Sequence, residues 1–175
     1  DGSFDPDALL EDSPAIVYLC SPNNPTGALL DVAAVDRVIA RATGVVILDE
    51  AYVEFSGVSR VAQAPARGTL LVVRTMSKAF GLAGLRVGWA AGAAALVRDI
   101  ELSRGPYTLG ALAERAAAAA LRHDAAWVMA RAAEAVSARE SLAAGLRALG
   151  LSPLPSAANF LLVPVPDAPR IAARM

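Results

Sequence analysis

Short apolar runs alternate along the first half of the chain with segments whose apolar residues recur at helical spacing. Three runs are continuous and rich in branched side chains, and we predict strands at 15–20, 45–48 and 70–73. The second and third of these runs are typical of strands buried on both faces of a sheet. A weaker fourth strand is predicted at 86–90. Between the first two strands, Asp31 has the character of an N-cap for a helix that extends to Ala42.

Strands that alternate with helices predict an α/β fold, here a doubly wound and mostly parallel sheet. In such sheets ligands bind at the carboxyl ends of the strands. Polar, chemically capable segments follow the three strong strands, and they form the candidate site: 21–27, 49–52 and 75–78.

The second half of the chain has a mostly helical pattern. Helices are predicted at about 93–102, 111–122 and 125–149, and a strand at 159–165. Prolines in and after this last segment confine it to an edge or terminus of a sheet.

Composition and charge exclude several kinds of partner. The formal net charge is -1 and no basic stripe with interleaved aromatic residues is present, so no nucleic-acid partner is expected. No apolar run is long enough to cross a bilayer, so no membrane partner is expected either. The first residues lack the pattern of a signal peptide, and a cytoplasmic location is expected. Neither Cys20, the only cysteine, nor His123, the only histidine, predicts a disulfide or a metal site.

Lys78 is the only lysine in the chain, and all other basic residues are arginine. A primary amine can deprotonate and attack a carbonyl, which a guanidinium cannot do. Lys78 follows a predicted buried strand in a turn of small residues, so we predict that it is a nucleophile. The alternative is a solvated surface lysine.

Three segments resemble, in order and spacing, the signature of fold-type-I pyridoxal-phosphate enzymes: Ser21–Gly27, Asp49–Tyr52 and Thr75–Arg86. Within that group the chain looks most like the histidinol-phosphate aminotransferases. The strings at 49–55 and 77–88, and Arg104-Gly105-Pro106-Tyr107, carry this likeness. The resemblance covers nearly the whole chain.

The resemblance implies a covalent bond between Lys78 and the aldehyde of pyridoxal 5'-phosphate. It also implies that the released amine shuttles a proton between the substrate α-carbon and the cofactor. Asp49 would pair with the pyridine nitrogen and keep it protonated, although a turn cap is an alternative role for this residue. Glu50 and Glu54 have the chemistry of acid–base residues, but the resemblance gives that role to the lysine.

The remaining implied contacts surround the cofactor. Asn24 and Tyr52 would contact its phenolic oxygen. The phosphate would be held by Ser77 and Arg86, with Thr75 as a third ligand, because an arginine fork binds phosphate in bidentate fashion. The substrate pocket would include Asn24 and Asn159.

The resemblance also divides the chain into two parts. Residues 1–125 would be the C-terminal part of the large pyridoxal-phosphate-binding domain, and residues 126–175 the connecting helix and the truncated start of a smaller α+β domain. The chain does not begin with Met and starts about midway through the family pattern. We therefore expect a piece of a longer, homodimeric protein, and an incomplete catalytic unit when it is alone.

The implied activity is transamination by a ping-pong mechanism, with glutamate and imidazole-acetol phosphate as substrates in histidine biosynthesis. Alternatives are an aromatic amino-acid aminotransferase and a related pyridoxal-phosphate decarboxylase of the cobalamin pathway. An alternative of a different class is a non-catalytic, truncated remnant. A nucleotide-binding module is disfavoured because no Gly-x-Gly-x-x-Gly follows a predicted strand.

Overall fold

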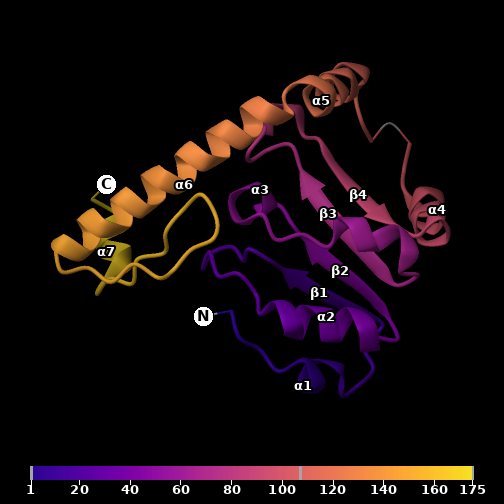
Figure 1. Cartoon of the computed structure of the whole chain (residues 1–175), viewed down its shortest axis with the longest axis horizontal. Coiled ribbons are helices and arrows are strands. Elements are labelled where there is room, and N and C mark those ends of the chain that lie inside the picture. Colours follow the sequence, from indigo (N-terminus) through magenta and orange to yellow (C-terminus); the bar gives the residue numbers. More distant parts are fainter. Residues whose placement is uncertain (1, 107, 175) are drawn as a thin grey trace.

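The described residues form a four-stranded sheet with helices packed around it (Figure 1). The computed structural model describes residues 2–106 and 108–174. The strands are β1 (Ile16–Cys20), β2 (Val45–Asp49), β3 (Leu70–Thr75) and β4 (Gly88–Gly92), in the order β1-β2-β3-β4. The first three are parallel and β4 pairs antiparallel with β3. The predicted α/β fold with a mostly parallel sheet is therefore confirmed, with the fourth strand beginning at Gly88 rather than Arg86.

The predicted helices are also present. Asp31 caps α2 by accepting a hydrogen bond from the Ala34 N–H at 2.7 Å. None of the described helices is long and apolar enough to cross a membrane. The α-helices are α1 (Pro6–Leu10), α2 (Val32–Arg41), α3 (Val53–Ser56), α4 (Ala94–Ser103), α5 (Ala111–His123), α6 (Ala125–Ala148) and α7 (Ala168–Ala172). Two 3-10 helices are η1 (Val61–Ala66) and η2 (Ala83–Leu85).

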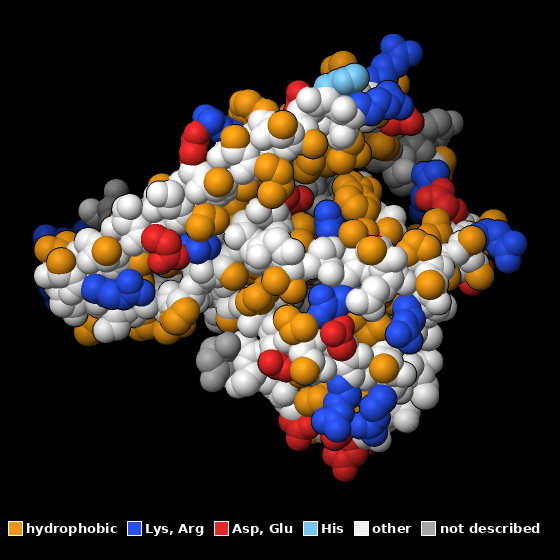
Figure 2. Space-filling model, in the orientation of Figure 1, with side chains coloured by type: hydrophobic (Ala, Val, Ile, Leu, Met, Phe, Trp, Pro, Cys, Tyr) orange, Lys and Arg blue, Asp and Glu red, His pale blue; other side chains and the backbone are white. Residues whose placement is uncertain are grey.

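The main core lies between the sheet and α2. Because side chains alternate across a strand, β1 to β3 send one set of residues to this face. That set packs with Val35, Val38 and Ile39 of α2, and it comprises Val17, Leu19, Val46, Leu48, Leu70 and Val72. A second cluster lies under α5 and comprises Met76, Val87, Ala117 and Ala120. Figure 2 shows hydrophobic side chains gathered beneath this helix.

The opposite face of β1 is open within the described part of the chain. Ile16 is 62% exposed and Tyr18 is 58% exposed. Within the described residues the apolar run of β1 is therefore buried on one face only, because no described element packs on its other face. A continuous apolar run indicates that both faces of a strand could be buried. The neighbouring elements determine which face is covered.

Residues 159–165, which were predicted to form a strand, lie in an irregular segment instead. A strand needs a neighbouring backbone to satisfy its N–H and C=O groups. Here the segment is tied to the preceding residues by a bond from the Leu154 N–H to the Leu162 carbonyl at 2.9 Å. The strand prediction was wrong for the described residues because apolar patterning gives no information on a partner strand.

Removing core volume should destabilise the fold strongly. Leu70 is fully buried in the main core, and Leu70→Ala should lower the free energy of unfolding by about 2–5 kcal/mol through lost burial and the cavity left behind. Leu102→Ala is the matched control, since Leu102 is 79% exposed and should change stability by no more than about 0.5 kcal/mol. Urea unfolding measures both, and equal effects would contradict this description of the core.

Candidate active site

The three polar segments predicted from the sequence meet at one edge of the sheet. In the strand register Cys20 lies opposite Asp49, and Asp49 lies opposite Val73. Pairing continues just past the strands: the Ser21 N–H donates to the Asp49 carbonyl and the Glu50 N–H to the Val73 carbonyl, both at 2.9 Å. The loops after β1, β2 and β3 therefore start side by side, as expected for the carboxyl ends of parallel strands.

Asn24 and Tyr52 are brought together from two of these loops. The Asn24 amide donates a hydrogen bond to the Tyr52 hydroxyl at 3.0 Å. A tight turn holds Asn24 in place, in which the Gly27 N–H donates to the Asn23 carbonyl at 2.7 Å. The Tyr52 side chain is buried, so its ring is a fixed wall of the site.

Lys78 lies over the ring of Tyr52. Its Nζ is 5.2 Å from the centroid of the Tyr52 ring. The turn that carries it is closed by hydrogen bonds from the Gly81 N–H to the Lys78 carbonyl at 3.0 Å and from the Leu82 N–H to the Met76 carbonyl at 2.9 Å. Gly81 adopts a φ of 68°, a conformation that favours glycine. The single lysine of the chain therefore stands at the carboxyl edge, exposed, above a closed turn.

Asp49, the last residue of β2, has both carboxylate oxygens engaged. Oδ1 accepts a hydrogen bond from the Ala51 N–H at 2.9 Å, and Oδ2 accepts one from the Tyr18 hydroxyl at 2.5 Å. Partial burial and the bond to this carboxylate raise the pKa of Tyr18 well above its usual range. Sequence reasoning missed Tyr18, because within an apolar run a tyrosine is typical of core. The two-residue periodicity that places it on the face of Asp49 was the available signal.

The three predicted phosphate ligands lie around the β3–β4 connection. The Ser77 N–H donates to Thr75 Oγ1 at 3.0 Å, and Thr75 pairs with Gly88 across the two strands. Arg86 therefore returns close to the end of β3. It has a φ of 55°, and its guanidinium donates to the Ala83 carbonyl at 3.0 Å while remaining exposed.

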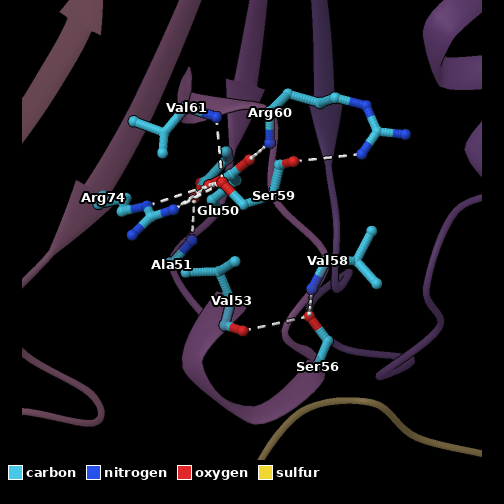
Figure 3. Close-up of polar contacts among 10 residues, drawn as sticks. Glu50, Ala51, Val53, Ser56, Val58, Ser59, Arg60, Val61 and Arg74 are labelled. Atoms are coloured by element: carbon cyan, nitrogen blue, oxygen red, sulfur yellow. Dashed lines mark hydrogen bonds and ion pairs between the residues drawn. The ribbon is translucent and has the colours of Figure 1, made fainter. Parts of the chain in front are cut away.

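Glu50 lies at the centre of a buried polar cluster (Figure 3). It is 1% exposed and accepts hydrogen bonds from Ser59 Oγ at 2.8 Å, from the Arg60 N–H at 2.6 Å, and from Arg74 Nε and Nη2 at 3.0 and 2.8 Å. The Arg74 guanidinium also lies 5.2 Å from the Trp89 ring centroid. With four donors on its two oxygens, Glu50 holds together the loop segments around it.

Glu54 and Cys20 are two other titratable groups near this edge whose pKa is shifted by their environment. Burial raises the pKa of the Glu54 carboxyl, and burial also raises the pKa of the Cys20 thiol. A thiol with a raised pKa is a weaker nucleophile near neutral pH. Cys20 is therefore poorly suited to act as a nucleophile at this edge of the sheet.

The segment after α6 reaches back to the site. The Phe160 and Tyr52 rings pack in a T-shaped arrangement, with centroids 5.2 Å apart and planes at 80°. The Ala157 N–H donates to the Gly27 carbonyl at 2.7 Å. Asn159, the predicted substrate contact, is exposed beside Phe160. Tyr107, the last residue of the Arg104-Gly105-Pro106-Tyr107 string of the resemblance, lies outside the described residues.

Comparison with known proteins places this geometry in a family. A family model described as aminotransferase class I and II matches residues 2–174. A histidinol-phosphate aminotransferase of Paracidovorax citrulli is 46% identical over 172 residues, which is 93% of this chain and 46% of that protein.

Solved structures agree with this placement. The crystal structure of histidinol-phosphate aminotransferase from Sinorhizobium meliloti in complex with pyridoxal-5'-phosphate matches with a TM-score of 0.78 and 29% identity, over 89% of this chain and 44% of that one. The L-threonine-O-3-phosphate decarboxylase of Porphyromonas gingivalis matches with a TM-score of 0.75 and 29% identity, over 85% of this chain and 46% of that one.

The chain therefore belongs to the class I and II aminotransferase family. Its mostly parallel sheet with flanking helices matches the large domain of fold-type-I pyridoxal-phosphate enzymes. The chain spans less than half the length of the curated relatives it matches.

Breaking the buried ion pair should destabilise the site. Arg74→Met leaves the Glu50 carboxylate buried without its charged partner and should cost about 3–5 kcal/mol in the free energy of unfolding. Glu50→Leu combined with Arg74→Met removes both charges and should recover part of that loss.

The matched control is Arg131→Met, which breaks the exposed ion pair with Glu134 and should cost no more than about 1 kcal/mol. Denaturant unfolding of the four proteins measures these differences. If Arg74→Met costs no more than Arg131→Met, then the Glu50 cluster does not hold the loop.

Proposed function

We propose that the complete protein carrying this chain is a pyridoxal 5'-phosphate-dependent aminotransferase. Its substrates would be glutamate and imidazole-acetol phosphate, in histidine biosynthesis, and its mechanism ping-pong. The proposal rests on the position of the only lysine. Lys78 lies over the Tyr52 ring, and the Asn24 amide donates a hydrogen bond to the Tyr52 hydroxyl. This group lies at the sheet edge where β2 ends with Asp49.

The side chains at this edge fit such a cofactor by their chemistry. An exposed primary amine suits an aldehyde, and a carboxylate suits a protonated ring nitrogen. An amide and a phenol joined by a 3.0 Å hydrogen bond suit a phenolate oxygen. The hydroxyls of Thr75 and Ser77 and the exposed guanidinium of Arg86 suit a phosphate. When bound, the cofactor supplies an electron sink for the substrate α-carbon.

The roles of the residues follow from these positions. Lys78 Nζ would hold the cofactor covalently and, once released, would move a proton at the substrate α-carbon. Asp49 would hold the proton at the ring nitrogen. Tyr52 and Asn24 would stabilise negative charge on the phenolic oxygen. Because Tyr52 is buried and braced by Phe160, it would keep that hydroxyl in place without reorganisation.

Ser77 and Arg86, with Thr75, would bind the phosphate. Asn24 and Asn159 would border the substrate pocket. The contact between Phe160 and Tyr52 supports this proposal, because it brings the segment after α6 to the site. Substrate identity rests on the relatives that are histidinol-phosphate aminotransferases. We also propose a cytoplasmic homodimer.

We further propose that residues 1–125 are the C-terminal part of the large domain and that residues 126–175 begin the smaller one. Both core clusters lie before α6, and α6 extends away from the sheet (Figure 1). Since the chain spans less than half of its relatives, residues 1–175 alone would be an incomplete catalytic unit.

A decarboxylase is the second candidate, favoured by the likeness to the L-threonine-O-3-phosphate decarboxylase structure. The two activities differ in product: amino transfer from glutamate yields 2-oxoglutarate, whereas decarboxylation releases CO₂. Assaying the complete protein with imidazole-acetol phosphate, an aromatic keto acid and phosphothreonine separates them. Fastest transfer to the aromatic keto acid would instead support an aromatic aminotransferase.

Lys78 should be the residue that binds the cofactor. Borohydride treatment of the complete protein with pyridoxal phosphate should fix the cofactor on Lys78, and the peptide is identified by mass spectrometry. Lys78→Arg keeps the charge but cannot condense with an aldehyde, so amino transfer should be lost and no label retained. A label on a different residue, or full activity in Lys78→Arg, would contradict the proposal.

Asp49 should control turnover more than substrate binding. Asp49→Ala removes the carboxylate that keeps the ring nitrogen protonated, and kcat should fall by at least about a hundredfold. Asp36→Ala is the control, because Asp36 is an exposed partner of Arg60 away from the edge. Steady-state kinetics with glutamate measure both, and near wild-type turnover in Asp49→Ala would refute the assigned role.

A further inference from the structure

Tyr18 has no place in the functions assigned so far, yet its hydroxyl is bonded to the carboxylate at the centre of the site. The bond from Tyr18 Oη to Asp49 Oδ2 is 2.5 Å long. We propose that Tyr18 is a positioning residue, which holds the Asp49 carboxylate in the orientation that the cofactor ring nitrogen requires. This inference rests on the proposed function.

The register of the sheet puts the two side chains on one face. Tyr18 lies opposite Ile47, and Cys20 lies opposite Asp49, so Tyr18 and Asp49 are diagonal neighbours on adjacent parallel strands. Adjacent strands lie only about 4.8 Å apart. The phenol of Tyr18 is long enough to span the diagonal distance to Asp49. Cys20 lies directly opposite Asp49, but its short thiol side chain is not a comparable hydrogen-bond donor.

The two bonds to Asp49 act on different oxygens. The Ala51 N–H holds Oδ1 at 2.9 Å, and Tyr18 holds Oδ2. The terminal torsion of an aspartate is broad, so a carboxylate held at one oxygen can still turn. A second bond on the other oxygen fixes its plane. Each carboxylate oxygen can accept more than one hydrogen bond, so Oδ2 remains able to accept from a ring N–H.

The environment keeps Tyr18 in its donor form. Partial burial and the Asp49 carboxylate raise the pKa of Tyr18, so the phenol stays protonated throughout the neutral range and donates. Tyr18 is 58% exposed on a sheet face that the described residues leave open, and it lies outside both core clusters.

A double-mutant cycle on the complete protein tests the proposal. The variants are Tyr18→Phe, Asp49→Ala and the pair together, with Ile16→Val as a control on the same exposed face. Kinetics with glutamate, the dissociation constant for pyridoxal phosphate and the thermal midpoint are measured for each. The cofactor-free proteins also receive a carbon-13 NMR titration of the tyrosine ring carbon next to the hydroxyl.

Tyr18→Phe should lower kcat about tenfold, the effect of one hydrogen bond to a charged group, with KM for glutamate within about twofold. It should also weaken cofactor binding and leave the thermal midpoint unchanged. In the Asp49→Ala background, Tyr18→Phe should have no further effect, because a residue that acts only through Asp49 has nothing left to position. In the titration, Asp49→Ala should move the Tyr18 signal toward the ordinary tyrosine range.

Equal effects of Tyr18→Phe in both backgrounds, or a loss confined to the thermal midpoint, would overturn the proposal while leaving the proposed function standing. An unshifted Tyr18 signal in Asp49→Ala would overturn it as well, without reference to activity. If Asp49→Ala alone leaves turnover and cofactor binding unchanged, then the proposed function fails, and the role of Tyr18 fails with it.

Discussion

The buried ion pair between Glu50 and Arg74 is the interaction on which the candidate site depends. A carboxylate that is 1% exposed is tolerated only when its oxygens are paired and hydrogen-bonded. Arg74, Ser59 and the Arg60 N–H provide those partners, and they come from β3 and from the segment before η1. Glu50, the first residue of the loop after β2, therefore attaches this loop to β3 and to the segment before η1.

The alternation of side chains along the strands puts Glu50 and Asp49 on opposite faces of the sheet. Glu50 continues β2 toward the core side, so Asp49 just before it must face the opposite side of the sheet. The same alternation puts Tyr18 and Thr75 on the side of Asp49 and Arg74 on the side of Glu50. The sheet therefore separates the Glu50–Arg74 ion pair from Asp49. Only the side chains on the face of Asp49 are available to a ligand.

Two glycines adopt backbone conformations that help to complete the site. Gly27 has a φ of 75°, and an added Cβ would lie 2.2 Å from Ser156 Oγ. This contact lets the Ala157 N–H reach the Gly27 carbonyl and brings Phe160 onto Tyr52. Gly81 permits the left-handed turn that closes under Lys78. A segment more than a hundred positions from Asn24 therefore borders the same site.

The sequence by itself determined the alternation of strands and helices, the mostly parallel sheet, and the identity of the polar groups at its carboxyl edge. It could do so because apolar periodicity and strand-end chemistry are local, and because Lys78 is the only primary amine among the side chains. Only the tertiary structure decided the contacts of Tyr18 and Glu50, the open face of β1, and the absence of a strand at the described residues 159–165. These depend on which neighbours lie across the sheet, and hydrogen-bond partners from distant segments leave no trace in a local pattern.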